Sequence, residues 1–157
     1  MMNVFDKNAT YLEKRERINL HINWTKPSFT DEADEYDQEV DNYLASKGIS
    51  IYGYDQLKKF LSHGSAEQLS IKELKKKNLK RFTLKPSQFR KIMKEPGYAD
   101  NYDRIENELL KNSVISMTMP IILDFGDEYY GFAGNRRMNL AFSHNIPVTF
   151  WVVDARK

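Results

Sequence analysis

The stretch from Tyr129 to Ala141, which reads YYGFAGNRRMNLA, constrains the fold more than any other part of the chain. Its first part, up to Ala133, is aromatic and apolar, which is typical of a buried strand. Gly134 follows, and the residues from Arg136 to His144 have the pattern of a short helix. A chain that passes through a glycine from a strand into a helix exposes the first amide groups of that helix, and these groups favour a negative charge.

Arg136 and Arg137 stand at this predicted helix start. Guanidinium groups match the geometry of phosphate, so these arginines together with Gly134 and Asn135 predict a phosphate site. Neighbouring side chains on a helix diverge by about 100°, because the helix has about 3.6 residues per turn, so only one arginine can point directly at a ligand. The alternative is structural, with an arginine that pairs with a carboxylate or packs its stem on the sheet.

Apolar runs elsewhere predict further elements. The run Pro120–Phe125 is followed by the hairpin turn Gly126–Asp127, and the run Pro147–Val153 predicts a final buried strand. Alternation over Arg17–Trp24 predicts a half-buried strand, and the apolar residues of Phe29–Leu44 share one face of a single amphipathic helix. The remaining predictions are short strands at 49–52 and 82–84, and helices at 55–61, 88–94, 102–112 and from the capping box at 70–73.

The outer face of the predicted helix Phe29–Leu44 is acidic. Carboxylates spread around a helix do not converge well on one cation. A solvated face is therefore favoured over a metal site or a mimic of nucleic-acid charge. The acidic residues are Asp31, Glu32, Asp34, Glu35, Asp37, Glu39 and Asp41.

A basic run later in the chain is the best local candidate for contact with a polyanion. It contains Lys75, Lys76, Lys77, Lys80 and Arg81. Aromatic residues are not interleaved with it, so base stacking is not indicated, and a solvated, lysine-rich helix end explains the same pattern. The formal net charge of the chain is only +2, so global charge adds little to a nucleic-acid hypothesis.

The composition excludes several classes of chemistry. The chain has no cysteine, which rules out disulfides, thiolate nucleophiles and cysteine-ligated metals. His21, His63 and His144 lie far apart in sequence without metal-ligand spacing, so no metal site is predicted. The N-terminus lacks a signal pattern, and no run approaches the roughly 20 apolar residues of a membrane helix. We therefore expect a soluble, cytoplasmic protein.

Four short pieces occur in an order that resembles the ParB/sulfiredoxin-like superfamily. They are Lys85–Arg90 (KPSQFR), Met119–Leu123 (MPIIL), Gly134–Arg137 (GNRR) with Ala141 after it, and Asn145–Val148 (NIPV). The resemblance covers roughly residues 79–154. It implies an α+β fold with a mixed sheet and short helices over residues 71–157. An N-terminal α/β extension over residues 1–70 would pack on this domain.

The resemblance also implies a ligand, a nucleoside triphosphate such as CTP or ATP, with Mg²⁺ bridging its phosphates. The implied binding residues are Gly134, Asn135, Arg136, Arg137, Gln88 and Arg90, the last two closing over the nucleotide. Arg137 is implied as the ligand-facing arginine. Two departures narrow the chemistry: sulfiredoxins carry an essential cysteine where this chain has Asn135, and the serine kinases of the superfamily carry an acid where it has Ala133.

Three functional hypotheses follow. The first is nucleotide binding, with NTPase or phosphotransferase activity left open because no catalytic base is identified. The second is DNA binding or nuclease action on the phosphate backbone, through the basic run and the arginine pair. The third is a non-catalytic accessory protein, of the phage or plasmid type, that binds another protein through the acidic helix. Sulfiredoxin chemistry and full partition-protein function are not expected.

Overall fold

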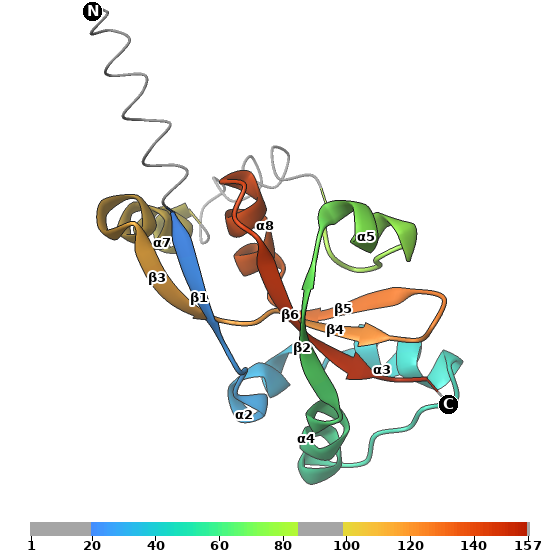
Figure 1. Cartoon of the computed structure of the whole chain (residues 1–157). Helices are drawn as coiled ribbons and strands as arrows, with labels where there is room; N and C mark the ends of the chain where they lie inside the picture. The colour runs from blue at the N-terminus through green and yellow to red at the C-terminus, as the bar shows by residue number, and fades with distance from the viewer. Residues whose placement is uncertain (1–19, 85–98, 157) are drawn as a thin grey trace, which may run out of the picture.

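A computed structural model describes residues 20–84 and 99–156, and within them the chain forms a mixed α+β fold (Figure 1). The larger sheet has four strands in the order β2-β6-β4-β5. The strand β6 runs antiparallel to β2 and parallel to β4, and β4 forms an antiparallel hairpin with β5. The bounds are β2 (Gly64–Leu69), β4 (Ile121–Asp124), β5 (Tyr129–Ala133) and β6 (Val148–Asp154).

A second, smaller sheet joins distant parts of the chain. The strand β1 (His21–Thr25) runs parallel to β3 (Val114–Thr118), with His21 opposite Val114. The chain then passes from β3 towards β4, and the backbone N–H of Met119 donates to the carbonyl of Thr25 at 2.8 Å. This connection ties the small sheet to the start of the large one.

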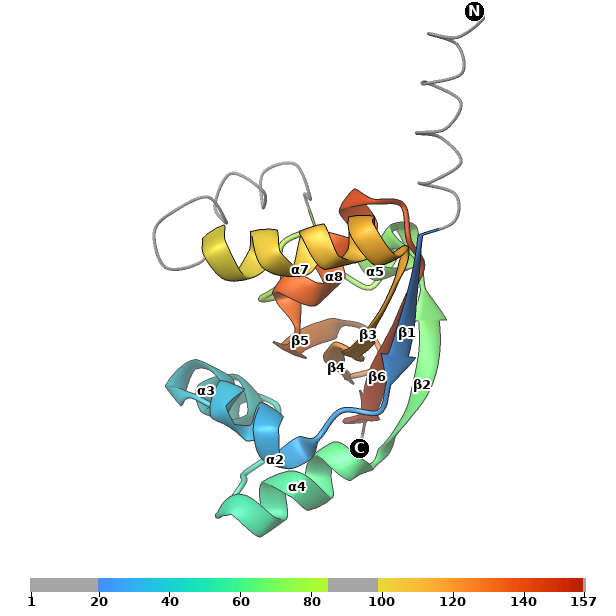
Figure 2. The same ribbon diagram turned by 90° about the vertical axis from the view of Figure 1, so that its left-hand side faces the viewer.

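Helices cover both faces of the larger sheet (Figure 2). One layer contains α2 (Phe29–Glu32), the 3₁₀ turn η1 (Ala33–Glu35), α3 (Gln38–Ser46) and α4 (Tyr54–Ser62). The other contains α5 (Ile71–Lys76), α7 (Ala99–Asn112) and α8 (Asn135–Ser143). Each layer buries its own cluster of apolar side chains against the sheet.

The central strand β6 shows why the sheet has two cores. Trp151 and Val153 belong to the cluster with α3 and α4, whereas Phe150 and Val152 belong to the cluster with α5, α7 and α8. Successive side chains of a strand point to opposite faces, and here both faces are buried. An uninterrupted apolar run, rather than alternation, is the expected pattern for such a strand.

The prediction of one helix over Phe29–Leu44 is wrong, because two capping residues divide that segment. The side chain of Ser28 accepts from the N–H of Asp31 at the start of α2, and Asp37 accepts from the N–H of Val40 at the start of α3. Between them, the backbone of Tyr36 is extended, with φ −81° and ψ 95°. Side chains such as Asp37 that bond to nearby amides favour a new helix start over helix continuation.

Other predicted elements agree with the structure to varying degrees. The helices predicted at 55–61, from Ser70, at 102–112 and at 136–144 correspond to α4, α5, α7 and α8, and the strand at Tyr129–Ala133 is β5. No strand forms at 49–52 or 82–84; Lys80 instead makes an isolated bridge to Tyr130. The helix predicted at 88–94 lies outside the described residues.

The segment up to residue 70 contributes to both sheets and to the core. It supplies β1, and it supplies β2 at the edge of the larger sheet. Val40, Leu44 and Leu61 are fully buried in the same cluster as Ile121 and Phe132. The α+β class predicted from the sequence is confirmed for the described residues.

Candidate phosphate site at the start of α8

Gly134 lies between β5 and α8 with a left-handed backbone, φ 101° and ψ 21°. A Cβ atom added there would lie 2.7 Å from Cα of Pro120 and 2.8 Å from Nη2 of Arg137. Both distances are far below van der Waals contact, and the first involves backbone that cannot move aside cheaply. Glycine is therefore required at this position by close packing as well as by the turn conformation.

The hairpin before Gly134 contains an irregularity that positions the site. The β4–β5 register shifts between Ile121, opposite Ala133, and Ile122, opposite Gly131, so β5 carries an extra residue at Phe132. This is the arrangement of a β-bulge, which leaves backbone groups without ladder partners. Nη1 of Arg81 donates to the carbonyl oxygens of Gly131 at 3.0 Å and Phe132 at 2.6 Å. Arg81 thus satisfies the backbone of the bulge.

Arg137, in the first turn of α8, is bound to a carboxylate of the protein itself. Its Nη2 donates to Oε1 of Glu32 at 2.7 Å, and the hydroxyl of Thr118 lies 3.5 Å from the same oxygen. The side chains of Arg137 and Glu32 are 26% and 12% exposed. Nε of Arg137 is buried and has no hydrogen-bond partner among the described residues. Arg137 therefore makes the contact of the structural alternative, a pair with a carboxylate of the chain, which α2 supplies.

Asn135 and Arg136 differ from Arg137 in their surroundings. Oδ1 of Asn135 accepts from the backbone N–H of Thr83 and from Nδ2 of Asn139, each at 3.0 Å. Asn135 therefore ties the chain after α5 to the start of α8. Arg136 is exposed, whereas Arg137 is partly buried, so the two arginines diverge as the helix geometry predicts.

A second arginine holds the rest of the acidic segment. Nε of Arg81 donates to Oε1 of Glu39 at 3.2 Å, and its Nη2 lies 3.5 Å from Oδ2 of Asp37 and 4.0 Å from Oε2 of Glu35. Its side chain is only 15% exposed. The interpretation of this acidic stretch as a solvated face is therefore wrong for Glu32, whereas Glu35, Asp37 and Glu39 stay exposed while they contact Arg81.

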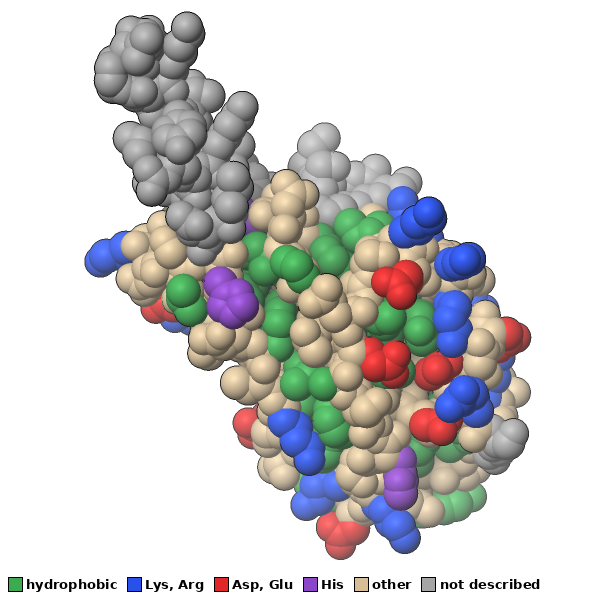
Figure 3. All heavy atoms as spheres, viewed as in Figure 1, with side chains coloured by type: hydrophobic (Ala, Val, Ile, Leu, Met, Phe, Trp, Pro, Cys, Tyr) green, Lys and Arg blue, Asp and Glu red, His purple; other side chains and the backbone are tan. Residues whose placement is uncertain are grey.

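The predicted basic run is divided between ion pairs and solvent. Lys77 pairs with Asp124 at 2.8 Å, Lys80 pairs with Glu128 at 3.4 Å, and Arg81 binds as described above. Lys75 and Lys76 are exposed. On the face seen in Figure 3, basic and acidic side chains are interspersed rather than gathered by sign. Gln88 and Arg90, predicted to close over the ligand, lie outside the described residues.

The other acids that could act as a catalytic base, Asp124, Asp127 and Glu128, are at the far end of the hairpin. Asp124 is held by Lys77, and Glu128, which is 8% exposed, lies between Lys80 and Lys47, the latter at 3.5 Å. Asp127 is exposed in the turn. Ala133 at the end of β5 is buried and offers no proton acceptor. The described part of the site can therefore bind and orient an anion, and the carboxylate beside Arg137 is that of Glu32, which the arginine itself holds.

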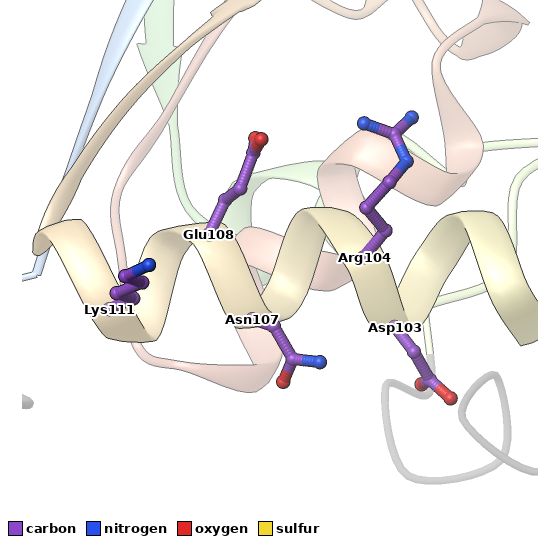
Figure 4. Close-up of a pocket in the computed structure, with 5 residues that line it drawn as sticks. All are labelled: Asp103, Arg104, Asn107, Glu108 and Lys111. Carbon is purple, nitrogen blue, oxygen red and sulfur yellow. The ribbon is translucent and has the colours of Figure 1, made fainter.

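Two surface hollows lie away from α8's first turn. One follows α7 and is bordered by Asp103, Arg104, Asn107, Glu108 and Lys111, all from that helix (Figure 4). The other, near the end of β6, is bordered by residues that include His63, Glu67, Asp154 and Arg156. Neither contains a residue predicted for phosphate binding. His144, which follows α8, places Nε2 2.7 Å from Oε2 of Glu106 on α7.

No group of three or more potential metal-ligating side chains occurs among the residues that the structure describes. Within the same ranges, the helices are too short or too polar to cross a membrane. Comparison with known proteins supplies no relative, since no family model, no curated protein and no solved structure matches the chain.

Proposed function

We propose that the chain binds the phosphates of a nucleoside triphosphate, CTP or ATP with Mg²⁺, at the start of α8, as its resemblance to the ParB/sulfiredoxin-like superfamily implies. The observation that carries the proposal is the pairing of Arg137 with a carboxylate at 2.7 Å in the first turn of a helix. A guanidinium group that holds one anion near a helix start is suited to another.

Arg137 has a donor beyond the one that Glu32 uses. Arg137 offers Nη2, now on Glu32, and a buried Nε without a partner among the described residues. A phosphate presents several oxygens and can accept from both nitrogens of the fork, which a monodentate carboxylate does not. The exposed Arg136 adds positive charge next to the site. Gln88 and Arg90 remain in the proposal as residues that close over the nucleotide.

Mg²⁺ fits this proposal only as a partner of the phosphates. It is commonly held by one or two carboxylates, by water and by phosphate oxygens of the substrate, and the described residues contain no metal-ligating group of three or more. Its contribution when bound would be to neutralise phosphate charge. The residues of the chain position the phosphates, and the proposal is accordingly one of binding, because Glu32, the carboxylate beside Arg137, is held by that arginine.

The test is calorimetric titration and thermal shift with CTP, ATP, GTP and UTP, each with Mg²⁺, on wild type, Arg137→Ala and Arg156→Ala. Arg156 is a matched control, since its guanidinium pairs with Asp154 at the end of β6 and is 59% exposed. Saturation at about 100 times Kd stabilises a protein by ~2.7 kcal/mol, which raises Tm by roughly 5–10 °C for a domain of this size. We expect such a shift in wild type and Arg156→Ala and its loss in Arg137→Ala.

Ligand-induced shifts, rather than absolute Tm values, are compared, because Arg137→Ala leaves Glu32 without its partner and lowers stability by itself. The proposal fails if none of the nucleotides shifts wild type, or if Arg137→Ala responds like wild type. The nucleic-acid hypothesis has less support, since Lys77, Lys80 and Arg81 are engaged within the chain. It predicts retention on DNA that weakens steeply with salt.

A further inference from the structure

We propose that Glu32 is a built-in competitor of the phosphate ligand, so that the chain regulates its own site through α2. The inference rests on the proposed function and adds a mechanism to it. Glu32 places Oε1 2.7 Å from Nη2 of Arg137, where a phosphate oxygen would otherwise accept the same hydrogen bond. One donor cannot serve two anions that repel each other, so binding of phosphate requires Glu32 to leave.

The parts of the acidic segment are anchored unequally, which allows such a release. α3 is fixed in the core by Val40 and Leu44, both fully buried, and Arg81 holds Asp37 and Glu39 just before and within it. By contrast, α2 is a helix of four residues that contains no buried residue. The extended backbone at Tyr36 separates the two. Glu32 can therefore turn away, or α2 can move, while α3 and its ion pairs stay in place.

The contacts that hold α2 come from α4, β3 and β6. The ring of Phe29 lies 5.9 Å from that of Trp151, and the hydroxyl of Tyr54 donates to the carbonyl of Thr30 at 2.8 Å. Ala33, in the following turn, is buried. Segments with so little buried apolar surface open at low free-energy cost relative to the core. The Glu32–Arg137 ion pair joins α2 to α8 and so links the two helical layers.

The expected effect is a reduced apparent affinity. When only a fraction of the molecules is competent to bind, the apparent Kd rises by the inverse of that fraction. If Glu32 leaves Arg137 in about one molecule in ten, removing its charge tightens binding by roughly tenfold. The substitution Glu32→Gln suits this purpose because glutamine keeps the size and an oxygen acceptor for Arg137 but loses the charge.

The probe is inorganic tripolyphosphate, titrated by calorimetry both in the presence of EDTA and with Mg²⁺. The proteins are wild type, Glu32→Gln, Arg137→Ala and Asp31→Asn. Asp31 is the matched control, since it is the exposed neighbour of Glu32 and makes no ion pair among the described residues. We expect Glu32→Gln to bind tripolyphosphate about tenfold tighter than wild type, and Asp31→Asn to bind like wild type. Circular dichroism verifies that each variant is folded.

Three outcomes separate this inference from the proposed function. Equal affinity of wild type and Glu32→Gln, with loss in Arg137→Ala, leaves the phosphate site standing and overturns the competition. Weaker binding by Glu32→Gln with Mg²⁺ but not with EDTA makes Glu32 a magnesium ligand instead, and also overturns it. If neither wild type nor Glu32→Gln binds tripolyphosphate, the proposed function and the inference both fail.

A second measurement does not depend on any variant. Hydrogen exchange of wild type is followed with and without saturating tripolyphosphate. Release of Glu32 predicts faster exchange of the amides of 29–36 on binding, with those of α3 unchanged, because α3 is anchored separately. Unchanged or stronger protection of 29–36 in the bound protein overturns the inference.

Discussion

The substitution Gly134→Ala tests whether this glycine is required by packing or merely by the turn. The new Cβ would lie 2.7 Å from Cα of Pro120, and Pro120 is itself held in the sheet because its carbonyl accepts from the N–H of Trp151 at 2.8 Å. The same Cβ would lie 2.8 Å from Nη2 of Arg137. The side chain can move away, whereas the proline backbone can do so only by distorting the sheet.

Two costs add at this position. A left-handed backbone costs a residue with a Cβ about 1–2 kcal/mol, and overpacking of a rigid site costs a further ~1–3 kcal/mol. We therefore expect Gly134→Ala to lower the free energy of unfolding by about 2–5 kcal/mol. Against a total of about 5–15 kcal/mol for a typical protein, this loss is easily measured.

The substitution Gly126→Ala measures the cost of the left-handed backbone alone. Gly126 also has a left-handed backbone, with φ 94°, but a Cβ there would meet only Arg156 side-chain atoms at 3.5 Å, an ordinary contact. Urea unfolding of both variants and of wild type, at equal temperature and salt, gives the loss in the free energy of unfolding for each substitution. The reasoning is refuted if Gly134→Ala is no more destabilised than Gly126→Ala, because close packing against Pro120 would then cost nothing.

Three further predictions concern other parts of the fold. The hydrogen bonds of Glu73 in its capping box, first with the Ser70 backbone and then with its hydroxyl, lower the pKa of Glu73. The stability that this carboxylate contributes is therefore present above its unfolded pKa and lost as pH falls through its folded pKa. Urea unfolding from about pH 7 to about pH 3 should show the difference in stability between wild type and Glu73→Gln narrowing with acid, and a constant difference would contradict this. Arg81→Met should cost about 1–3 kcal/mol, because two carbonyls of the β5 bulge lose their donor; an unchanged denaturation midpoint would show that they find water instead. Leu61→Ala, at a fully buried position of α4, should cost about 2–5 kcal/mol in the same assay, whereas a near-neutral result would mean that the first seventy residues are not part of one cooperative core.

The elements with strong local signals were predictable. The apolar run of β5, the glycine before α8 and the capping box of α5 each decide the local conformation without help from the rest of the chain. The strand β2 had no such signal, since its sequence GSAEQL is polar and its pattern largely exposed. Its strand conformation depends on pairing with β6, a partner distant in sequence.

The candidate site was predictable in its position but not in its contacts. The divergence of Arg136 and Arg137 follows from helix geometry, and so did the expectation that one of them faces inwards. The partner of Arg137 could not be deduced, because Glu32 comes from α2, which lies far from α8 in the sequence. Long-range ion pairs of this kind depend on tertiary structure, and periodicity carries no information about them. Gln88 and Arg90 remain predictions.

The place of β6 in the sheet has a consequence for folding. It lies between β2 and β4, yet it follows both of them in the chain. Likewise, β1 can pair only after β3, which comes much later in the sequence, has been made. During synthesis, the facing edges of β2 and β4 must stay unpaired until β6 emerges, and such edges can pair with other chains. Contacts between distant residues also slow folding. We therefore expect slow refolding, and nascent chains that depend on protection from aggregation until the last strand is made.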